Sequence, residues 1–297
     1  NVVIQNKLNM NRSILIIFPI LLLLLIVGCS KNDPSVNATR LRISLTDAPL
    51  QVKEEGVIVT EMNINIQKIE VSLVDTLDNG EDWVTLDYNG GVYNILPLTN
   101  GKSMQIADQY FPTGVLRRVK VTFGDNNTIK ANGTTRNLVL DSSAKEGITL
   151  VVNANLYANY ISNIMIDVNA SLSLFEENGN FIFKPNIRAF AETSGGALRG
   201  YVLPPESNPR VIIANEVDTL FTFPELKDGL FMFKGLQVGE WDIYVFADPL
   251  SGYADTIFTD TIYLGKTTDI KSKIVLKKIT QGGGEEEEGD KDGDESK

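Results

Sequence analysis

The chain has 297 residues, a formal net charge of −11, a single cysteine and no histidine. The lack of histidine excludes Ser-His-Asp and Cys-His catalysis, together with zinc sites of the usual histidine-containing kinds. The acidic balance argues against nucleic acid as a partner, because phosphate binding needs a basic face.

The N-terminal segment carries an uninterrupted apolar run of 14 residues, Ile14–Val27, preceded by Lys7 and Arg12. A spanning helix needs about 20 apolar residues, and this run is shorter and contains Pro19. A basic start followed by a short apolar run is typical of a secretory signal peptide. A buried helix is the alternative, but the run has no amphipathic period. We therefore expect residues 1–28 to be a signal peptide.

The run ends in Ile26-Val27-Gly28-Cys29, which resembles the lipobox of bacterial lipoproteins. The resemblance implies that Cys29 is lipidated and becomes the first residue of the mature chain. We expect translation to start at Met10, because residues 10–28 have the proportions of a signal peptide. Each buried acyl methylene contributes about 0.8 kcal/mol, so several acyl chains on one cysteine hold a protein at a bilayer. The membrane is then a partner through this lipid anchor, and the mature chain has a formal charge of −13 because two positive charges are removed.

Residues 29–40 form the expected lipidated N-terminus and a tether without apolar period. The residue after the lipobox is Ser30 rather than an aspartate. In many Gram-negative bacteria, a lipoprotein without an aspartate at this position is sorted to the outer membrane. The segment "SKND" resembles the charged tags of surface lipoproteins in the Bacteroidetes. The periplasmic face of the outer membrane and the cell surface are the two alternative locations.

From Leu41 onward apolar residues alternate with period two, as in half-buried strands. Leu41, Ile43 and Leu45 begin the pattern, and a one-residue slip at Gln67-Lys68 predicts a β-bulge. In the segment 115–123 we expect the odd-numbered residues to share one face and the even-numbered residues the other.

Asn-Gly pairs lie between strand-like runs at Asn132-Gly133 and Asn178-Gly179. Both positions of such a pair tolerate positive φ, so each predicts a hairpin, over "NNTIKANGTTRNLVL" and "ASLSLFEENGNFIFKP". Since no long helical period is present, the sequence predicts an all-β protein with mostly antiparallel strands.

Small residues at Glu192–Gly200 separate a larger unit, 41–192, from a smaller one, 196–278. We expect two β-sandwich domains in tandem. The last segment, 279–297, is acidic and of low complexity, and nothing in it can form a core. It predicts a disordered tail.

The larger unit resembles the bacterial domain-of-unknown-function family 4382. The matching motifs are "TDAP" at 46–49, "IQKIEV" at 66–71, "YNILPLTNG" at 93–101, "NIMIDVNASLSL" at 163–174 and "FKPNIRAF" at 183–190. The resemblance implies an envelope lipoprotein and a β-sandwich, without an established reaction.

The smaller unit resembles the carboxypeptidase regulatory-like domain, a transthyretin-like sandwich. The pattern places a tight turn at Asp228-Gly229, Phe231 and Phe233 on one face, Leu236 in the core, and Trp241 where the family has tyrosine. Such domains are accessory modules without active sites, so the resemblance argues against catalysis.

Four charged residues are candidate ligands. Asp47 follows a strand and is either a ligand or an Asx-turn residue that bonds the backbone two residues on. Asp167, Lys184 and Arg188 are expected in the strands that flank Asn178-Gly179, either as a binding cluster or as cross-strand pairs that stabilise the sheet.

These observations favour a non-catalytic binding or adhesion module in the envelope, with a glycan or an envelope protein as partner and without a metal or other cofactor. A structural or assembly protein of the periplasm is the first alternative. The second is a carboxylate-dependent glycoside hydrolase, which needs two acids about 5–9.5 Å apart in a cleft.

Overall fold

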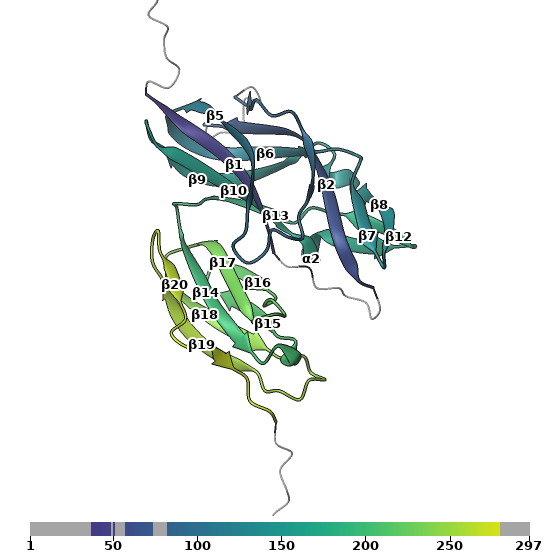
Figure 1. Cartoon of the computed structure of the whole chain (residues 1–297). Helices are drawn as coiled ribbons and strands as arrows, with labels where there is room; N and C mark the ends of the chain where they lie inside the picture. The colour runs from purple at the N-terminus through teal and green to yellow at the C-terminus, as the bar shows by residue number, and fades with distance from the viewer. Residues whose placement is uncertain (1–36, 49, 51–56, 74–81, 280–297) are drawn as a thin grey trace, which may run out of the picture.

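The computed structural model describes residues 37–48, 50, 57–73 and 82–279. The signal peptide, Cys29, the tether up to residue 36 and the tail from residue 280 lie outside the described residues. The described chain forms two β-sandwiches in tandem, each with its own hydrophobic core (Figure 1). The predicted all-β class is confirmed. No helix in this part of the chain has the length and apolar character needed to span a membrane.

The first sandwich packs a four-stranded sheet against a larger one. The small sheet has the order β13-β10-β1-β5, with bounds β1 Ala38–Ala48, β5 Met104–Pro112, β10 Ile161–Asn169 and β13 Ile187–Ala191. The large sheet runs β11-β12-β8-β7-β2-β6-β9, with β3 and β4 paired to β2. Its bounds are β2 Val59–Ser72, β3 Val84–Thr85, β4 Gly91–Asn94, β6 Gly114–Phe123, β7 Thr128–Ala131, β8 Thr134–Leu140, β9 Ile148–Leu156, β11 Leu174–Glu177 and β12 Asn180–Phe183.

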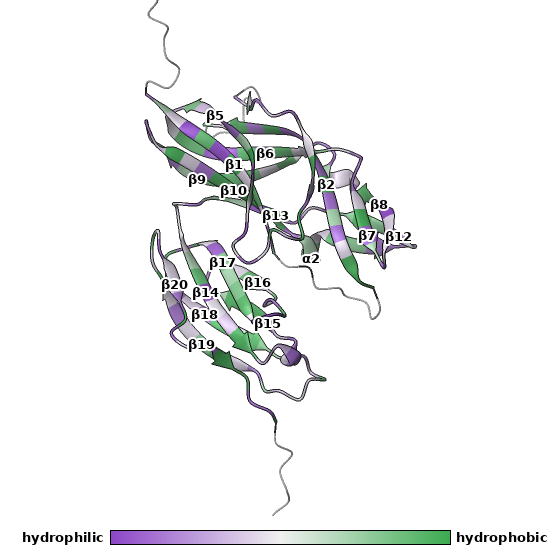
Figure 2. Ribbon diagram, in the orientation of Figure 1, coloured by the Kyte–Doolittle hydropathy of each residue, from purple (hydrophilic) through white to green (hydrophobic). Residues whose placement is uncertain are grey.

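The alternation seen in the sequence decides which face of β1 is buried. Leu41, Ile43 and Leu45 are inside the first core, whereas Arg40 between them and the tether is exposed. Figure 2 shows hydrophobic and hydrophilic residues alternating along β1 and β2. The small sheet therefore has an inner face on the core and an outer face directed away from it.

The register shifts in three pairings of the large sheet, those of β2 with β6, of β6 with β9 and of β2 with β7. The slip predicted at Gln67-Lys68 is confirmed, because the pairing of β2 with β6 shifts between Ile66 and Lys68. A second shift, between Leu116 and Arg118 in the pairing of β6 with β9, was not expected. It puts Leu116 on the buried face with Val119 and Val121, so the strict odd-even division predicted for 115–123 is wrong.

Both predicted hairpins form. Asn132 and Asn178 adopt φ of 49° and 51° at the turns of β7–β8 and β11–β12. The start of the second predicted hairpin is instead one helical turn, α2, over Ala170–Ser173. Asn169 caps this turn by accepting the N–H of Leu172 at 3.0 Å. The turn carries the chain from the small sheet to the large one.

The second sandwich consists of the sheets β17-β14-β20, with β21 paired to β14, and β16-β15-β18-β19. The bounds are β14 Gly196–Leu203, β15 Arg210–Ala214, β16 Thr219–Thr222, β17 Leu230–Leu236, β18 Gly239–Phe246, β19 Thr256–Ile262, β20 Thr267–Asp269 and β21 Ile274–Val275. Two 3-10 turns, η1 Ser142–Ala144 and η2 Pro205–Ser207, complete the elements.

The core of the second sandwich follows the sequence pattern. Phe231, Phe233 and Leu236 are buried together, and Gly229 makes the turn before them with φ of 79°. Trp241 is fully buried and donates its indole N–H to the carbonyl of Gln237 at 2.9 Å. Trp241 is thus a core residue.

Candidate functional site at the junction of the two sandwiches

The second sandwich packs on the outer face of the small sheet. On β10 and β13 the registered pairs Asp167–Arg188 and Met165–Phe190 lie on this face, because the neighbouring Ile187 and Ala189 pack on the core. Met165 is fully buried although it belongs to neither hydrophobic core.

Arg188 joins the two sandwiches through its guanidinium group. Its Nε donates to Asp167 Oδ2 at 2.8 Å, and its Nη2 donates to the backbone carbonyl of Lys234 on β17, also at 2.8 Å. The guanidinium carbon lies 4.8 Å from the ring centroid of Phe190. The planar fork of arginine allows these contacts at once, which a lysine at this position could not make.

Asn100 makes the second bond to the edge of β17. Because β17 ends its sheet, one row of its backbone groups lacks a neighbouring strand. The N–H of Met232 in this row donates to Asn100 Oδ1 at 3.3 Å. Asn100 and Arg188 thus bind the open edge of the second sandwich with side chains of the first.

Two glycines let the backbones approach closely at this junction. A Cβ on Gly101 would lie 2.5 Å from the sulfur of Met232, and one on Gly235 would lie 2.3 Å from the ring of Phe190. Both glycines have positive φ, at +85° and +66°. A larger residue at either position would therefore meet both backbone strain and the opposite sandwich.

Ion pairs lie at the rim of the junction. Lys102 Nζ is 3.0 Å from Glu225 Oε1, and Lys234 Nζ is 3.7 Å from Glu192 Oε1. Exposed pairs of this kind contribute about 0–1 kcal/mol each. These ion pairs therefore add little to the stability of the junction, and the hydrogen bonds of Arg188 and Asn100 contribute more of it.

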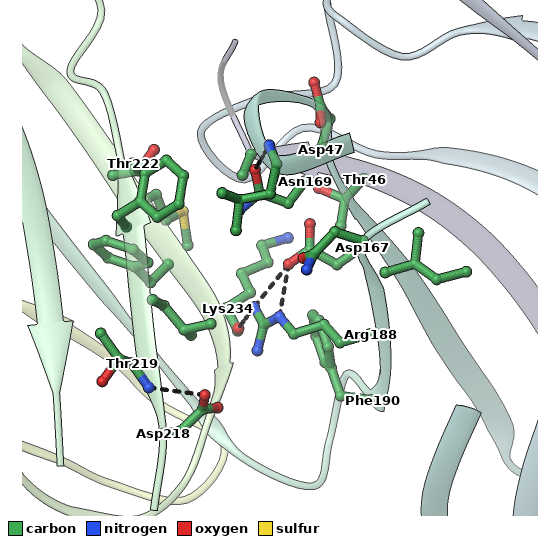
Figure 3. Close-up of a pocket in the computed structure, with 18 of the residues that line it drawn as sticks. Thr46, Asp47, Asp167, Asn169, Arg188, Phe190, Asp218, Thr219, Thr222 and Lys234 are labelled. Atoms are coloured by element: carbon green, nitrogen blue, oxygen red, sulfur yellow. Dashed lines mark hydrogen bonds and ion pairs between the residues drawn. The ribbon is translucent and has the colours of Figure 1, made fainter. Parts of the chain in front are cut away.

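A cavity of about 290 Å³ lies between the sandwiches (Figure 3). Figure 3 shows Asp167 and Lys234 about the Arg188 guanidinium, with Asp218 and Thr219 contributed by the second sandwich. The cavity mixes polar and apolar walls and has room for several water molecules. The Asp167 carboxylate on its wall accepts the hydrogen bond from Arg188 Nε.

Asp47 is a buried residue that lines this cavity, and of the two interpretations given for it, the Asx turn is wrong. The residue two positions on is Pro49, which has no N–H to donate. Asp47 Oδ1 instead accepts the N–H of Ala170 at 3.1 Å, at the start of α2. Among the described residues, its Oδ2 has no hydrogen-bond partner. Burial raises the pKa of Asp47 well above its ordinary value.

Asp47 and Asp167 both line this cavity, but they lie on opposite faces of the small sheet. Asp47 continues the inward-facing series of Leu45, whereas Asp167 lies on the outer face beside Thr46, its registered partner. In Figure 3 the carboxylate of Asp47 is directed away from Arg188, and that of Asp167 toward it. The arrangement gives no support to a carboxylate-dependent glycoside hydrolase.

The structure brings Asp167 and Arg188 together but not Lys184. The strands that flank Asn178-Gly179 are β11 and β12 of the large sheet, whereas Asp167 and Arg188 lie on β10 and β13 of the small one. Lys184 follows β12. The hydrogen bond from the Ser143 hydroxyl lowers the pKa of Asp141, and the Lys184 charge adds to this effect. The predicted cluster of three is wrong because α2 moves the chain to the other sheet between them.

The remaining predicted site residues, Cys29 and the lipobox residues Ile26, Val27 and Gly28, lie outside the described residues. Within the described part of the chain, no three acidic or cysteine side chains are grouped to hold a metal ion. Sequence reasoning missed Asn100 and the two junction glycines. The "TNG" and "FKG" turns mark them as bends, but the sequence carries no sign of their partners across the junction.

Residues 38–185 match the family described as "Domain of unknown function (DUF4382)". The chain therefore carries a DUF4382 domain, in agreement with the resemblance of the larger unit. The carboxypeptidase regulatory-like resemblance of the smaller unit stays a prediction. No curated protein matches the sequence.

Several solved structures resemble the chain at low identity. The Bacillus anthracis TIE protein matches at 12% identity over 92% of this chain and 46% of that protein, with a TM-score of 0.25. The minor pilin of Streptococcus agalactiae matches at 11% identity over 82% of this chain and 98% of the pilin, with a TM-score of 0.22. A fimbrial protein from Bacteroides ovatus matches at 10% identity over 81% of this chain and 49% of that protein, with a TM-score of 0.23. The chain spans less than half of the TIE and the fimbrial protein.

Proposed function

We propose that this chain, which carries a DUF4382 domain, is a lipid-anchored envelope protein that acts as a non-catalytic binding or adhesion module. The junction of the two sandwiches carries the proposal. Arg188 and Asn100 bind the open edge of β17, and Gly101 and Gly235 allow close contact. Two sandwiches held together in this way can present a binding surface away from the membrane.

The anchor in this proposal is Cys29. The basic start, the short apolar run and the "IVGC" motif support it. Ser30 after the cysteine favours the outer membrane. The partner is a glycan or an envelope protein that meets the exposed loops of the sandwiches.

Fatty-acid labelling in cells tests the anchor. Cells that express the full chain are fed an alkyne-bearing fatty acid, and the protein is analysed for label and for its distribution between membrane and soluble fractions. We expect the parent protein to be labelled and membrane-bound, and C29S to be unlabelled and released. A labelled C29S protein, or an unlabelled parent, would contradict the anchor.

Photo-crosslinking in the native envelope tests the binding role. A crosslinking residue at exposed Leu226 or Leu250 should capture a discrete envelope protein or glycan. Protease added to intact cells separates the two leading functions. Cleavage of the parent supports a module on the cell surface, and full protection supports the periplasmic assembly role.

A further inference from the structure

Four exposed aromatic or apolar side chains gather at the end of the first sandwich where β1 begins. They are Tyr110 (50% exposed), Tyr157 (61%), Tyr160 (67%) and Ile161 (52%). The rings of Tyr157 and Tyr160 meet edge to face at 6.2 Å, and the Arg40 guanidinium lies 6.0 Å from the centroid of Tyr110. We name these five residues the anchor-side patch.

The patch is built directly on the first residues of β1. Arg40 is the registered partner of Tyr110 on one side and of Ile161 on the other. The Arg40 N–H and the Thr39 hydroxyl both donate to the carbonyl of Tyr160, at 2.8 and 3.0 Å. The patch therefore holds a fixed position at the point where the chain from Cys29 enters the fold.

Covalent geometry keeps the patch close to an anchor at Cys29. Eight residues separate Cys29 from Ala38. An extended chain spans at most about 3.3–3.6 Å per residue, so β1 begins within about 30 Å of the cysteine. The described chain ends on the second sandwich, at the opposite end of the molecule (Figure 1). Of the two ends, the one with the patch would be the nearer to a bilayer that holds Cys29.

The chemistry of the patch matches a lipid headgroup region. Tyrosine rings concentrate at membrane interfaces, where the ring meets apolar matter and the hydroxyl meets water. Arg40 is paired with Asp108 at 2.7 Å, so the tyrosine rings and Ile161 carry this match rather than a free positive charge. We infer that the anchor-side patch rests on the interface of the leaflet that holds the acyl chains of Cys29. This inference depends on the proposed lipid anchor.

Fluorescence of the full lipidated protein in vesicles tests the inference. The variant Y160W puts a tryptophan in the patch, and L250W puts one in the second sandwich, where Leu250 is 92% exposed. The parent protein corrects for Trp83 and Trp241. Vesicles of phosphatidylcholine and phosphatidylethanolamine are prepared with and without lipids brominated near the carbonyl end of the acyl chains. Flotation of each sample reports the anchor independently.

We expect Y160W to show blue-shifted emission and strong quenching by the brominated lipids, and L250W to show neither. Flotation of both variants with equal, weak quenching would overturn the inference and leave the anchor standing. A response of Y160W to soluble oligosaccharide instead of brominated lipid would also overturn it, and would make the patch a glycan site. Loss of flotation in the parent would overturn the anchor and the inference together.

Discussion

Asn100 of the first sandwich accepts, at its Oδ1, the backbone N–H of Met232 on the open edge of β17 in the second sandwich, at 3.3 Å. An open sheet edge is a place where another strand can add. Side chains of the first sandwich occupy this edge, so its hydrogen-bonding groups are used within the chain. The junction is thereby part of the fold of both sandwiches, and it can be tested one bond at a time.

The Asn100 bond is tested by Asn100→Gly. Asn100 has a φ of 52°, which glycine adopts without strain, so this change removes the acceptor and keeps the backbone. We expect faster hydrogen exchange of the Met232 amide and a loss of about 0.5–1.5 kcal/mol in the free energy of unfolding. Asn159→Gly, at a φ of 61°, is the matched control. Unchanged exchange at Met232 would show that Asn100 does not hold the edge.

The Arg188 bonds are tested by Arg188→Leu. The change removes the charge-assisted bonds to Asp167 and to the Lys234 carbonyl, and we expect a loss of about 1–3 kcal/mol in the free energy of unfolding. Calorimetry should then resolve two transitions, since each sandwich has its own core. Arg199→Leu, which removes an exposed pair with Asp269, is the control and should cost about 0–1 kcal/mol. Equal effects of the two changes would rule out a special role for Arg188.

The close approach at Gly235 is tested by Gly235→Ala. Gly265 has the same φ of +66°, but no heavy atom lies within 4 Å of the position that its Cβ would take, so Gly265→Ala carries the backbone strain alone. That strain costs about 1–2 kcal/mol. We expect Gly235→Ala to lose about 1–3 kcal/mol more in urea unfolding, because its methyl group meets Phe190. Matching losses in the two variants would mean that Phe190 moves aside freely.

Local sequence pattern predicted the parts of the fold that depend on neighbouring residues. The alternation at Leu41, Ile43 and Leu45 predicted the buried face of β1, and the two Asn-Gly pairs predicted both hairpins. Each of these features is decided by side-chain period or by the φ of one or two residues. They are visible in a single sequence for that reason.

The predictions that failed concern contacts between residues far apart in the sequence. Asp47 bonds Ala170, 123 residues away, and Arg188 bonds Lys234, 46 residues away. The single turn of α2 separates Lys184 from the sheet of Asp167, although the chain returns to that sheet at Arg188. No period or turn signal encodes such partners, so the junction could not be predicted from the sequence.

Asp47 gives the fold a dependence on pH. Burial is the main cause of its raised pKa, and the nearby Asp167 charge adds to it, while the bond from Ala170 opposes it. Between the ordinary pKa of 3.8 and the raised value, the folded state binds more protons than the unfolded state. The contribution of Asp47 to stability therefore falls as pH rises through that window.

Asp47→Asn removes this titration while keeping an oxygen that can accept the Ala170 N–H. We expect the parent to lose stability relative to the variant as pH rises above about 4, with no further change above the raised pKa. Urea midpoints measured from pH 3 to pH 8 check it. Asp108→Asn is the control of opposite sign, because a hydrogen bond from Arg40 lowers the pKa of Asp108. In this comparison, the parent should lose stability relative to Asp108→Asn as pH falls. Parallel midpoint curves for the parent and Asp47→Asn would show that the Asp47 carboxyl titrates alike in the folded and unfolded chains.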